Sequence, residues 1–236
     1  MRFRSPLVEG RLVQRYKRFL ADVELADGTI ITAHCANPGS MMGLKEPGSR
    51  VFLAAATNPK AKLSHSWELI EADLPGGTQL VGINTANPNR LAEDAILGGQ
   101  IPELSGYETF RREVKYGENS RVDILLTDSA RPPCFVEVKN CHLMRSNDLA
   151  EFPDSVTERG AKHLAELARE VGGGARAVML FVVQMQADSF TLAADLDPGY
   201  AKAFKSAYSS GVEVLAYTCR IALDEIVVDR RIPIRM

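Results

Sequence analysis

The chain has few cysteines and no long apolar run, and each shortage excludes a class of protein. The four cysteines among its 236 residues are scattered and form no CxxC pair. This spacing fits no zinc-binding pattern and predicts buried free thiols in a reducing compartment. No stretch approaches the roughly 20 apolar residues that a transmembrane helix needs, and no apolar signal core follows Met1–Pro6. We therefore expect a cytoplasmic protein with no membrane partner.

Two nucleotide-binding signatures are also missing. The sequence contains neither GxGxxG nor GxxxxGK(S/T), the loops that hold dinucleotides and nucleoside triphosphates. An enzyme of small-molecule metabolism that depends on such a cofactor therefore has no support. The composition itself is ordinary for a globular protein, with 45% hydrophobic and 25% charged residues.

Positive charges do not outnumber negative charges in the whole chain, but they are concentrated near the N-terminus. The net charge is −2, whereas nucleic-acid-binding domains are usually basic. Residues 1–20 nevertheless hold six Lys or Arg and a single acid, with Tyr16 and Phe19 between the cations. Such a segment can track phosphates and stack bases; a solvated strand surface is the alternative. The cations that we expect to contact nucleic acid are Arg11, Arg15, Lys17 and Arg18.

Residues 1–83 are predicted to form an all-β unit. Strand-length segments alternate with turn signals such as Ala26–Gly28 and Pro75–Gly77, and no long amphipathic helix interrupts them. About five short strands in roughly eighty residues predict a small barrel, for which an oligonucleotide-binding (OB) barrel is one candidate. The predicted strands are Val8–Gln14, Phe19–Leu25, Thr29–Ala33, Val51–Ala56, Trp67–Ala72 and Gln79–Ile83.

Residues 84–236 are predicted to mix helices and strands in the order α-β-β-β-α-β-α-β. Ser155 and Glu158 fit a capping box that would start the second helix, and Asp197–Pro198 would start the third. The continuous apolar run Ala177–Met185 predicts a central strand, buried on both faces. The chain therefore divides into two domains at residues 83 and 84.

A β-hairpin in this second unit carries the most informative residues. Ser120–Leu126 and Cys134–Lys139 are apolar runs of strand length, and Asp128–Pro133 between them is turn-like. A hairpin symmetric about Ala130 places Asp123 directly opposite Glu137. Their Cβ atoms would then be roughly 5 Å apart.

Two ionised carboxylates at that distance repel each other, and a divalent cation relieves the repulsion by binding oxygens from both. Lys139 lies two residues beyond Glu137, so its amine projects from the same face of the strand. Asp123, Glu137 and Lys139 therefore form a candidate catalytic set for phosphodiester hydrolysis, with Mg²⁺ or Mn²⁺ on the acids. The alternatives are solvent-facing acids, or a plain ion pair between Lys139 and Glu137.

The element order and these acids resemble the PD-(D/E)XK nuclease superfamily. Nearly the whole chain resembles the sugar fermentation stimulation protein A family. Pro38 departs from the pattern, because threonine stands there in many members, so any hydroxyl role is absent. The runs that carry the resemblance are Ala33–Met41, Arg121–Asp123, Val136–Asn140 and Phe152–Leu164.

The resemblance implies an N-terminal OB barrel joined to a restriction-endonuclease-like mixed sheet flanked by helices. It also implies DNA binding linked to the regulation of sugar metabolism of the maltose type. A helix acid often completes the metal site in such nucleases, which makes Glu93 a candidate third ligand and catalytic residue; a plain surface residue is the alternative. We therefore expect a DNA-binding protein with an Mg-dependent nuclease-like site, or a non-catalytic regulator of the same fold. Single-stranded DNA and RNA stay open as partners, and so does the oligomeric state.

Two further groups are candidates for binding nucleic acid. Arg159 and His163 are four residues apart on a helix and so share one face, where they can hold a phosphate or orient a carboxylate. Asn37, Gly39 and Ser40 lie in a loop whose backbone amides can cradle a phosphate. An idle helix surface and an ordinary barrel turn are the respective alternatives.

Overall fold

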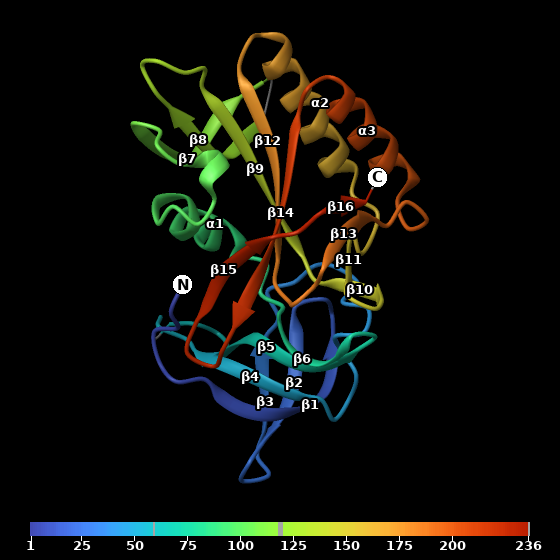
Figure 1. Cartoon of the computed structure of the whole chain (residues 1–236). Coiled ribbons are helices and arrows are strands. Elements are labelled where there is room, and N and C mark those ends of the chain that lie inside the picture. The colour runs from blue at the N-terminus through green and yellow to red at the C-terminus, as the bar shows by residue number, and fades with distance from the viewer. Residues whose placement is uncertain (59, 118–119, 236) are drawn as a thin grey trace.

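The computed structural model describes residues 1–58, 60–117 and 120–235 and forms a barrel below a larger unit of helices and strands (Figure 1). Six strands make up the barrel sheet: β1 (Val8–Tyr16), β2 (Leu20–Leu25), β3 (Ile30–His34), β4 (Arg50–Ala55), β5 (His65–Leu74) and β6 (Gly77–Gly82). Their order is β3-β2-β1-β4-β5-β6, and a parallel bridge between His34 and Ser66 joins β3 to β5. Five strands therefore close into an OB-like barrel, as predicted, and β6 extends it.

The barrel closes around alternating apolar side chains. Leu12 on β1, and Ala21 and Val23 on β2, are buried, while their neighbours along each strand point outward. Trp67 on β5 is fully buried, and its indole N–H donates to the Leu69 carbonyl at 2.9 Å. The one tryptophan of the chain is thus a core residue of the barrel.

The second unit contains a large mixed sheet with the order β15-β14-β12-β9-β8-β7. Strands β9, β12 and β14 run parallel, and the remaining neighbours are antiparallel. Its strands are β7 (Thr109–Tyr116), β8 (Ser120–Thr127), β9 (Cys134–Cys141), β12 (Arg176–Val183), β14 (Glu213–Ile221) and β15 (Ile226–Arg231). The helices are α1 (Pro88–Leu97), α2 (Glu158–Gly172) and α3 (Pro198–Ser209), with a 3-10 turn at Pro102–Leu104.

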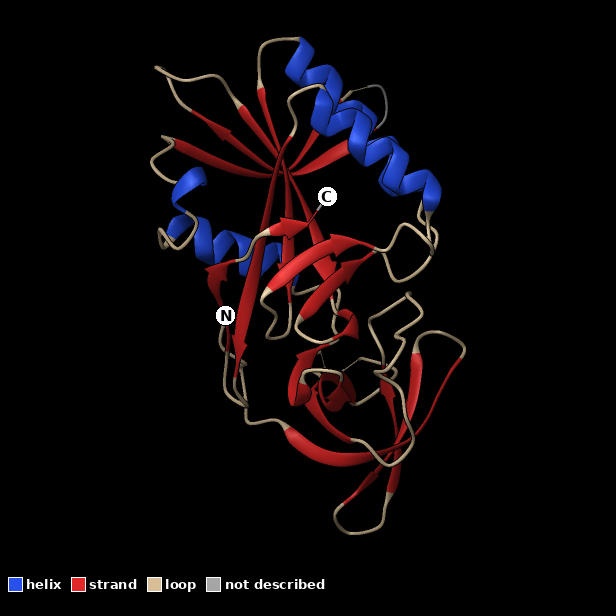
Figure 2. Cartoon of the chain, turned by 45° about the vertical axis from the view of Figure 1, so that its right-hand side comes forward, coloured by secondary structure: helices blue, strands red, loops and turns tan. Residues whose placement is uncertain are grey.

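Helices cover both faces of this sheet (Figure 2). Met179 and Phe181 of β12 belong to the same apolar cluster as residues of α2 and α3, whereas Val178 and Leu180 belong to the cluster that contains α1. Since successive strand residues point to opposite faces, β12 is buried on both sides, as its apolar run predicted. No helix within the described residues is long and apolar enough to cross a membrane.

The start of α3 agrees with the prediction from the sequence, whereas the start of α2 corrects it. Asp197 caps α3 as predicted, and its carboxylate accepts from the Tyr200 N–H at 2.8 Å. The expected cap at Ser155 is wrong, because Thr157 caps α2 and accepts from the Gly160 N–H at 3.1 Å. The Ser155 hydroxyl instead donates to Asp154 at 3.3 Å.

A small sheet and the C-terminal strands were not predicted. The small sheet has the order β10-β11-β13-β16, and none of its strands exceeds four residues. They are β10 (Leu143–Ser146), β11 (Leu149–Phe152), β13 (Ser189–Leu192) and β16 (Ile234–Arg235). Such short segments carry too little periodicity to be recognised in a sequence.

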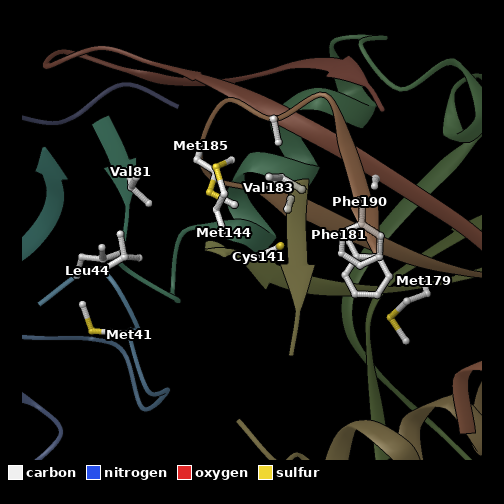
Figure 3. Close-up of a cluster of buried hydrophobic side chains, with 14 of the residues drawn as sticks. Met41, Leu44, Val81, Cys141, Met144, Met179, Phe181, Val183, Met185 and Phe190 are labelled. Carbon is white, nitrogen blue, oxygen red and sulfur yellow. The ribbon is translucent and has the colours of Figure 1, made fainter. Parts of the chain in front are cut away.

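The two units share one apolar core. Figure 3 shows Met41, Leu44 and Val81 of the barrel side facing Met144 and Met185 of the second unit, and all five belong to one buried cluster. The Gly82 N–H also donates to the Gln184 carbonyl at 2.9 Å. Continuous packing of this kind resists relative movement of the units, so residues from both can form one site.

Candidate metal centre and nucleic-acid interface

The register of the β8–β9 hairpin brings the two predicted acids together. Ile124 pairs with Val136 at the end of the ladder, and Asp123 and Glu137 are the next residue on each strand. They lie close enough for the charge of Glu137 to act on Asp123. Beyond the ladder, one carboxylate oxygen of Asp123, Oδ2, accepts from the Val138 N–H at 2.8 Å.

Asp123 is half-buried and held from two sides. Its second oxygen, Oδ1, accepts from the Asn89 side chain in the first turn of α1 at 2.8 Å. Partial burial and the nearby charge of Glu137 raise the pKa of Asp123. Sequence reasoning missed Asn89, because only the placement of α1 brings it to this strand.

Glu137 is 2% exposed and only partly satisfied. Its Oε1 accepts from the Lys139 ammonium at 2.7 Å and contacts His163 Nδ1. Burial alone would raise the pKa of Glu137, but the hydrogen bonds from His163 and Lys139 outweigh it and lower the pKa. The other oxygen, Oε2, is buried and has no hydrogen-bond partner among the described residues.

On α2, His163 contacts the Glu137 carboxylate, and Arg159 contacts His163. Arg159 Nε donates to His163 Nε2 at 3.4 Å, which leaves the proton of a neutral imidazole on Nδ1, where it faces Glu137. His163 is buried and orients this acid. Arg159 is exposed at the start of α2 and stays available to a phosphate.

Glu93 lies on α1 but does not reach the acids. Its carboxylate forms an ion pair with Arg112 at 3.1 Å, and Asn89, four residues earlier on the same helix, contacts Asp123 instead. In the part of the chain that the structure describes, no group of three His, Cys, Asp or Glu side chains is arranged to hold a metal. A ligand role for Glu93 therefore stays a prediction that requires Arg112 to release it.

Asp123 and Glu137 nevertheless fit a divalent cation. A buried carboxylate oxygen without a partner costs free energy, and so does a charge held near a second one of the same sign. A hard cation with oxygen ligands removes both costs. The unpartnered Glu137 Oε2 and the raised pKa of Asp123 are the two observations that support this fit.

The predicted barrel loop is braced from within the protein. Arg15 donates through Nη2 to the carbonyls of Asn37 and Gly39, at 2.8 and 3.1 Å. The fully buried Asn37 donates to the Ile83 carbonyl at 2.8 Å and accepts from the Gly39 N–H at 2.9 Å. Arg15 and Asn37 therefore shape this loop around Gly39.

The other N-terminal cations are exposed. Arg11 donates to the Gly48 carbonyl at 3.0 Å. Lys17 and Arg18 form the turn between β1 and β2 with φ angles of 46° and 64°, a left-handed conformation that is uncommon outside glycine. Their side chains are exposed.

Asp154 joins the barrel loop to the second unit. It accepts from the Met41 N–H at 3.1 Å and from the Ser40 hydroxyl at 3.4 Å, and it pairs with His142 at 3.5 Å. A Cβ on Gly39 would lie 2.4 Å from an Asp154 oxygen, so this approach requires glycine. Ser40, expected to bind phosphate, is thus held by a carboxylate.

Asp154→Asn should destabilise the protein in a pH-dependent way. Burial favours the neutral acid, but the hydrogen bonds from His142 and Met41 lower the pKa of Asp154 to about 2. A lowered pKa gives stability above the ordinary value near 3.8, and that stability is lost as the pH falls towards 2. Chemical denaturation should show a loss of about 2 kcal/mol at pH 7, shrinking by pH 3. The exposed Glu24→Gln serves as control, and an Asp154→Asn deficit independent of pH would contradict the assignment.

The whole chain is similar to sugar fermentation stimulation proteins. It matches the model of the sugar fermentation stimulation protein RE domain over residues 86–225 and that of the SfsA N-terminal OB domain over residues 13–83. The sugar fermentation stimulation protein homologs of Methylobacterium nodulans and Azorhizobium caulinodans are 60% and 58% identical over 234 residues, which cover 99% of each chain. The structure of Pyrococcus furiosus SfsA in complex with Ca²⁺ has a TM-score of 0.88 and 27% identity, covering 100% of this chain and 98% of that one.

Proposed function

Since the chain belongs to the sugar fermentation stimulation protein family, we propose that it binds DNA and hydrolyses phosphodiester bonds with a divalent cation, Mg²⁺ or Mn²⁺, held by Asp123 and Glu137. The observation that carries this proposal is the buried Glu137 Oε2 without a hydrogen-bond partner among the described residues. This carboxylate lies near Asp123 and beside the Lys139 ammonium. The Pyrococcus relative was described in complex with Ca²⁺, and Ca²⁺ and Mg²⁺ both prefer oxygen ligands, which supports a divalent cation here.

The residues around the acids have separate roles in this proposal. A bound cation would polarise the phosphate and lower the pKa of an attacking water. His163 holds Glu137 in one orientation through Nδ1. Lys139 is 17% exposed, so its ammonium can turn from Glu137 to a phosphate oxygen and stabilise the charge that develops there.

The proposed DNA surface includes Arg11, Lys17 and Arg18 on the barrel and Arg159 at the start of α2. We propose that Gly39 lies at the edge of this surface, whereas Arg15, Asn37, Ser40 and His163 support it from within. We also propose that the two domains divide at residues 83 and 84. The four cysteines are free and buried, which supports a reducing compartment and a cytoplasmic location.

Neutralising Lys17 and Arg18 together should flatten the salt dependence of DNA binding. Each phosphate that the protein no longer neutralises reduces the slope of log affinity against log salt by about 0.9, so the double variant to serine should reduce it by about 2. Anisotropy titrations with a labelled duplex at several salt concentrations measure this slope. Lys202→Ser with Lys205→Ser, which removes two exposed cations of α3, is the matched control. An unchanged slope in the first pair would move the binding surface away from the barrel.

The proposal as a whole is tested by incubating the pure protein with labelled single- and double-stranded DNA and RNA. Each substrate is offered with Mg²⁺, Mn²⁺ or EDTA, and the products are resolved by length. Cleavage that requires a cation and disappears in EDTA is the expected result. A protein that binds DNA but leaves all four substrates whole would be a non-catalytic regulator. That alternative is favoured by the saturation of Glu137 Oε1 by Lys139 and His163 within the chain.

A further inference from the structure

A pocket of about 340 Å³ lies where the barrel meets the second unit. The barrel loop at Pro38 and Gly39 forms one wall, and the segment from Phe152 to Thr157 forms the other. Asn140 and His142, at the end of β9 and just beyond it, also line it. The volume lies in the range of small-molecule and cofactor pockets.

The lining combines apolar surfaces with polar groups at their edges. Pro38, Phe152 and Val156 are apolar, whereas Asn140, His142 and Asp154 supply donors and acceptors. A nucleobase has the same character, since its faces stack on apolar side chains and its edges form hydrogen bonds.

The negative charge of Asp154 favours a base over a phosphate as the ligand of this pocket. Burial raises the pKa of Asp154, but hydrogen bonding lowers it to about 2, so the carboxylate is ionised at neutral pH. Its Oδ1 accepts only from the Ser155 hydroxyl among the described residues, at 3.3 Å. A fixed negative charge repels a phosphate, while a spare acceptor oxygen suits the amino groups of bases.

Hydrogen bonds within the protein hold the walls of the pocket in place. The Asn140 amide nitrogen contacts His142 Nδ1 at 2.6 Å, and Gln184 donates to the Asn140 oxygen at 2.6 Å. Gln184 is fully buried and also donates to the Asn84 carbonyl at 3.3 Å. A pocket with braced walls loses little conformational freedom when it binds.

The pocket shares two elements with the proposed catalytic residues. Asn140 directly follows Lys139 on β9, and their side chains lie on opposite faces of the strand. Thr157 lines the pocket and caps α2, the helix from which His163 contacts Glu137. A nucleotide whose base entered the pocket would lie at the start of this helix, with the exposed Arg18 at the rim.

We propose that this pocket receives the base of a single unpaired nucleotide, so that the protein prefers DNA with an unpaired or extruded base over a fully paired duplex. The inference rests on the proposed function, because it names the substrate class of that site. Its basis is the neighbourhood of the pocket and the catalytic residues, together with the mixed lining and the acidic edge.

Binding to three duplexes tests the preference. One duplex is fully paired, the second carries one extra nucleotide in one strand, and the third carries an abasic residue at that extra position. Anisotropy is measured in EDTA, which separates binding from cleavage. The unpaired base should strengthen binding by about tenfold over both other duplexes, the scale of one base-stacking contact.

Val156→Trp fills the pocket from its rim and should remove this preference while leaving affinity for the paired duplex unchanged. Val156 is 69% exposed, so the fold tolerates the larger side chain. Tyr208→Trp at the end of α3, where the tyrosine is 52% exposed, is the matched control. 2-Aminopurine at the extra position gives a second signal: its fluorescence should change on binding to wild type and to Tyr208→Trp, but not to Val156→Trp.

Equal affinity for the three duplexes would overturn the pocket assignment and leave the proposed DNA binding intact. A preference that survives Val156→Trp would also overturn it, because the base would then sit elsewhere. Absence of binding to every duplex would overturn both proposals.

Discussion

Asp123→Ala should abolish the binding of Mn²⁺ that calorimetry detects in the wild-type protein. The substitution removes one of the two carboxylates that the hairpin brings near each other. Loss of a partner that only orients a ligand costs 10- to 100-fold in metal affinity, so loss of a ligand should cost more than roughly 100-fold. Glu93→Ala should weaken binding much less, since Glu93 is paired with Arg112 and a water can replace an outer ligand.

A second variant separates the loss of a ligand from a loss of fold. Asp123→Asn keeps an oxygen that accepts from the Val138 N–H. It removes a carboxyl group whose pKa is raised by burial and by the charge of Glu137. A raised pKa means that the ionised carboxylate destabilises the fold at neutral pH, so this variant should melt no lower than wild type without a cation. Added Mn²⁺ should raise the melting temperature of wild type and not of the variant. Glu24→Ala is the charge control, and wild-type affinity in Asp123→Ala would refute the shared site.

Lys139→Ala should stop cleavage without loss of cation or DNA binding. The ammonium contacts Glu137 from the same strand, on the oxygen that His163 also contacts, and a preorganised charge at the reacting phosphate contributes on the order of a hundredfold to a thousandfold. Cleavage rates at saturating DNA should fall by that amount. Mn²⁺ should bind at least as tightly as in wild type, because the lysine no longer competes for Glu137.

DNA affinity should fall by less than about tenfold, the scale of a single phosphate contact at moderate salt. Lys115→Ala, which removes an exposed cation of β7 in the same sheet, should leave the rate unchanged. If Lys139→Ala cleaves as fast as wild type, the lysine is only a partner of Glu137. If wild type is inert on every substrate, the catalytic part of the proposal fails and the DNA-binding part survives.

The hairpin that carries the two acids could be predicted from the sequence because its determinants are local. Two apolar runs and a short turn set the register that brings Asp123 near Glu137, and the two-residue period of a strand puts Lys139 beside Glu137. The same local patterns identified the barrel strands, the start of α3 at Asp197 and the buried strand β12.

The surroundings of the acids depend on how distant elements pack, which no local pattern encodes. Placement of α1 decides that Asn89 reaches Asp123 while Glu93 pairs with Arg112. The sequence left two roles open for His163, to hold a phosphate or to orient a carboxylate. Packing of α2 against the sheet places it on the Glu137 carboxylate. Strands of two to four residues, such as β10 and β16, form only because neighbouring strands supply their hydrogen bonds.

The contact between the two units likewise separates what the sequence determined from what the tertiary structure decided. The sequence alone determined that a small barrel precedes a unit of mixed helices and strands and that a basic segment lies near the N-terminus, because strand period, turn chemistry and charge are properties of short segments. The nuclease-like character of the second unit came from the family resemblance. Only the tertiary structure decided that Arg15 braces the barrel loop, that Asp154 accepts from Met41 across the interface, and that a pocket opens between them. These contacts join residues far apart in the chain, and their geometry exists only after both units have packed on their common core.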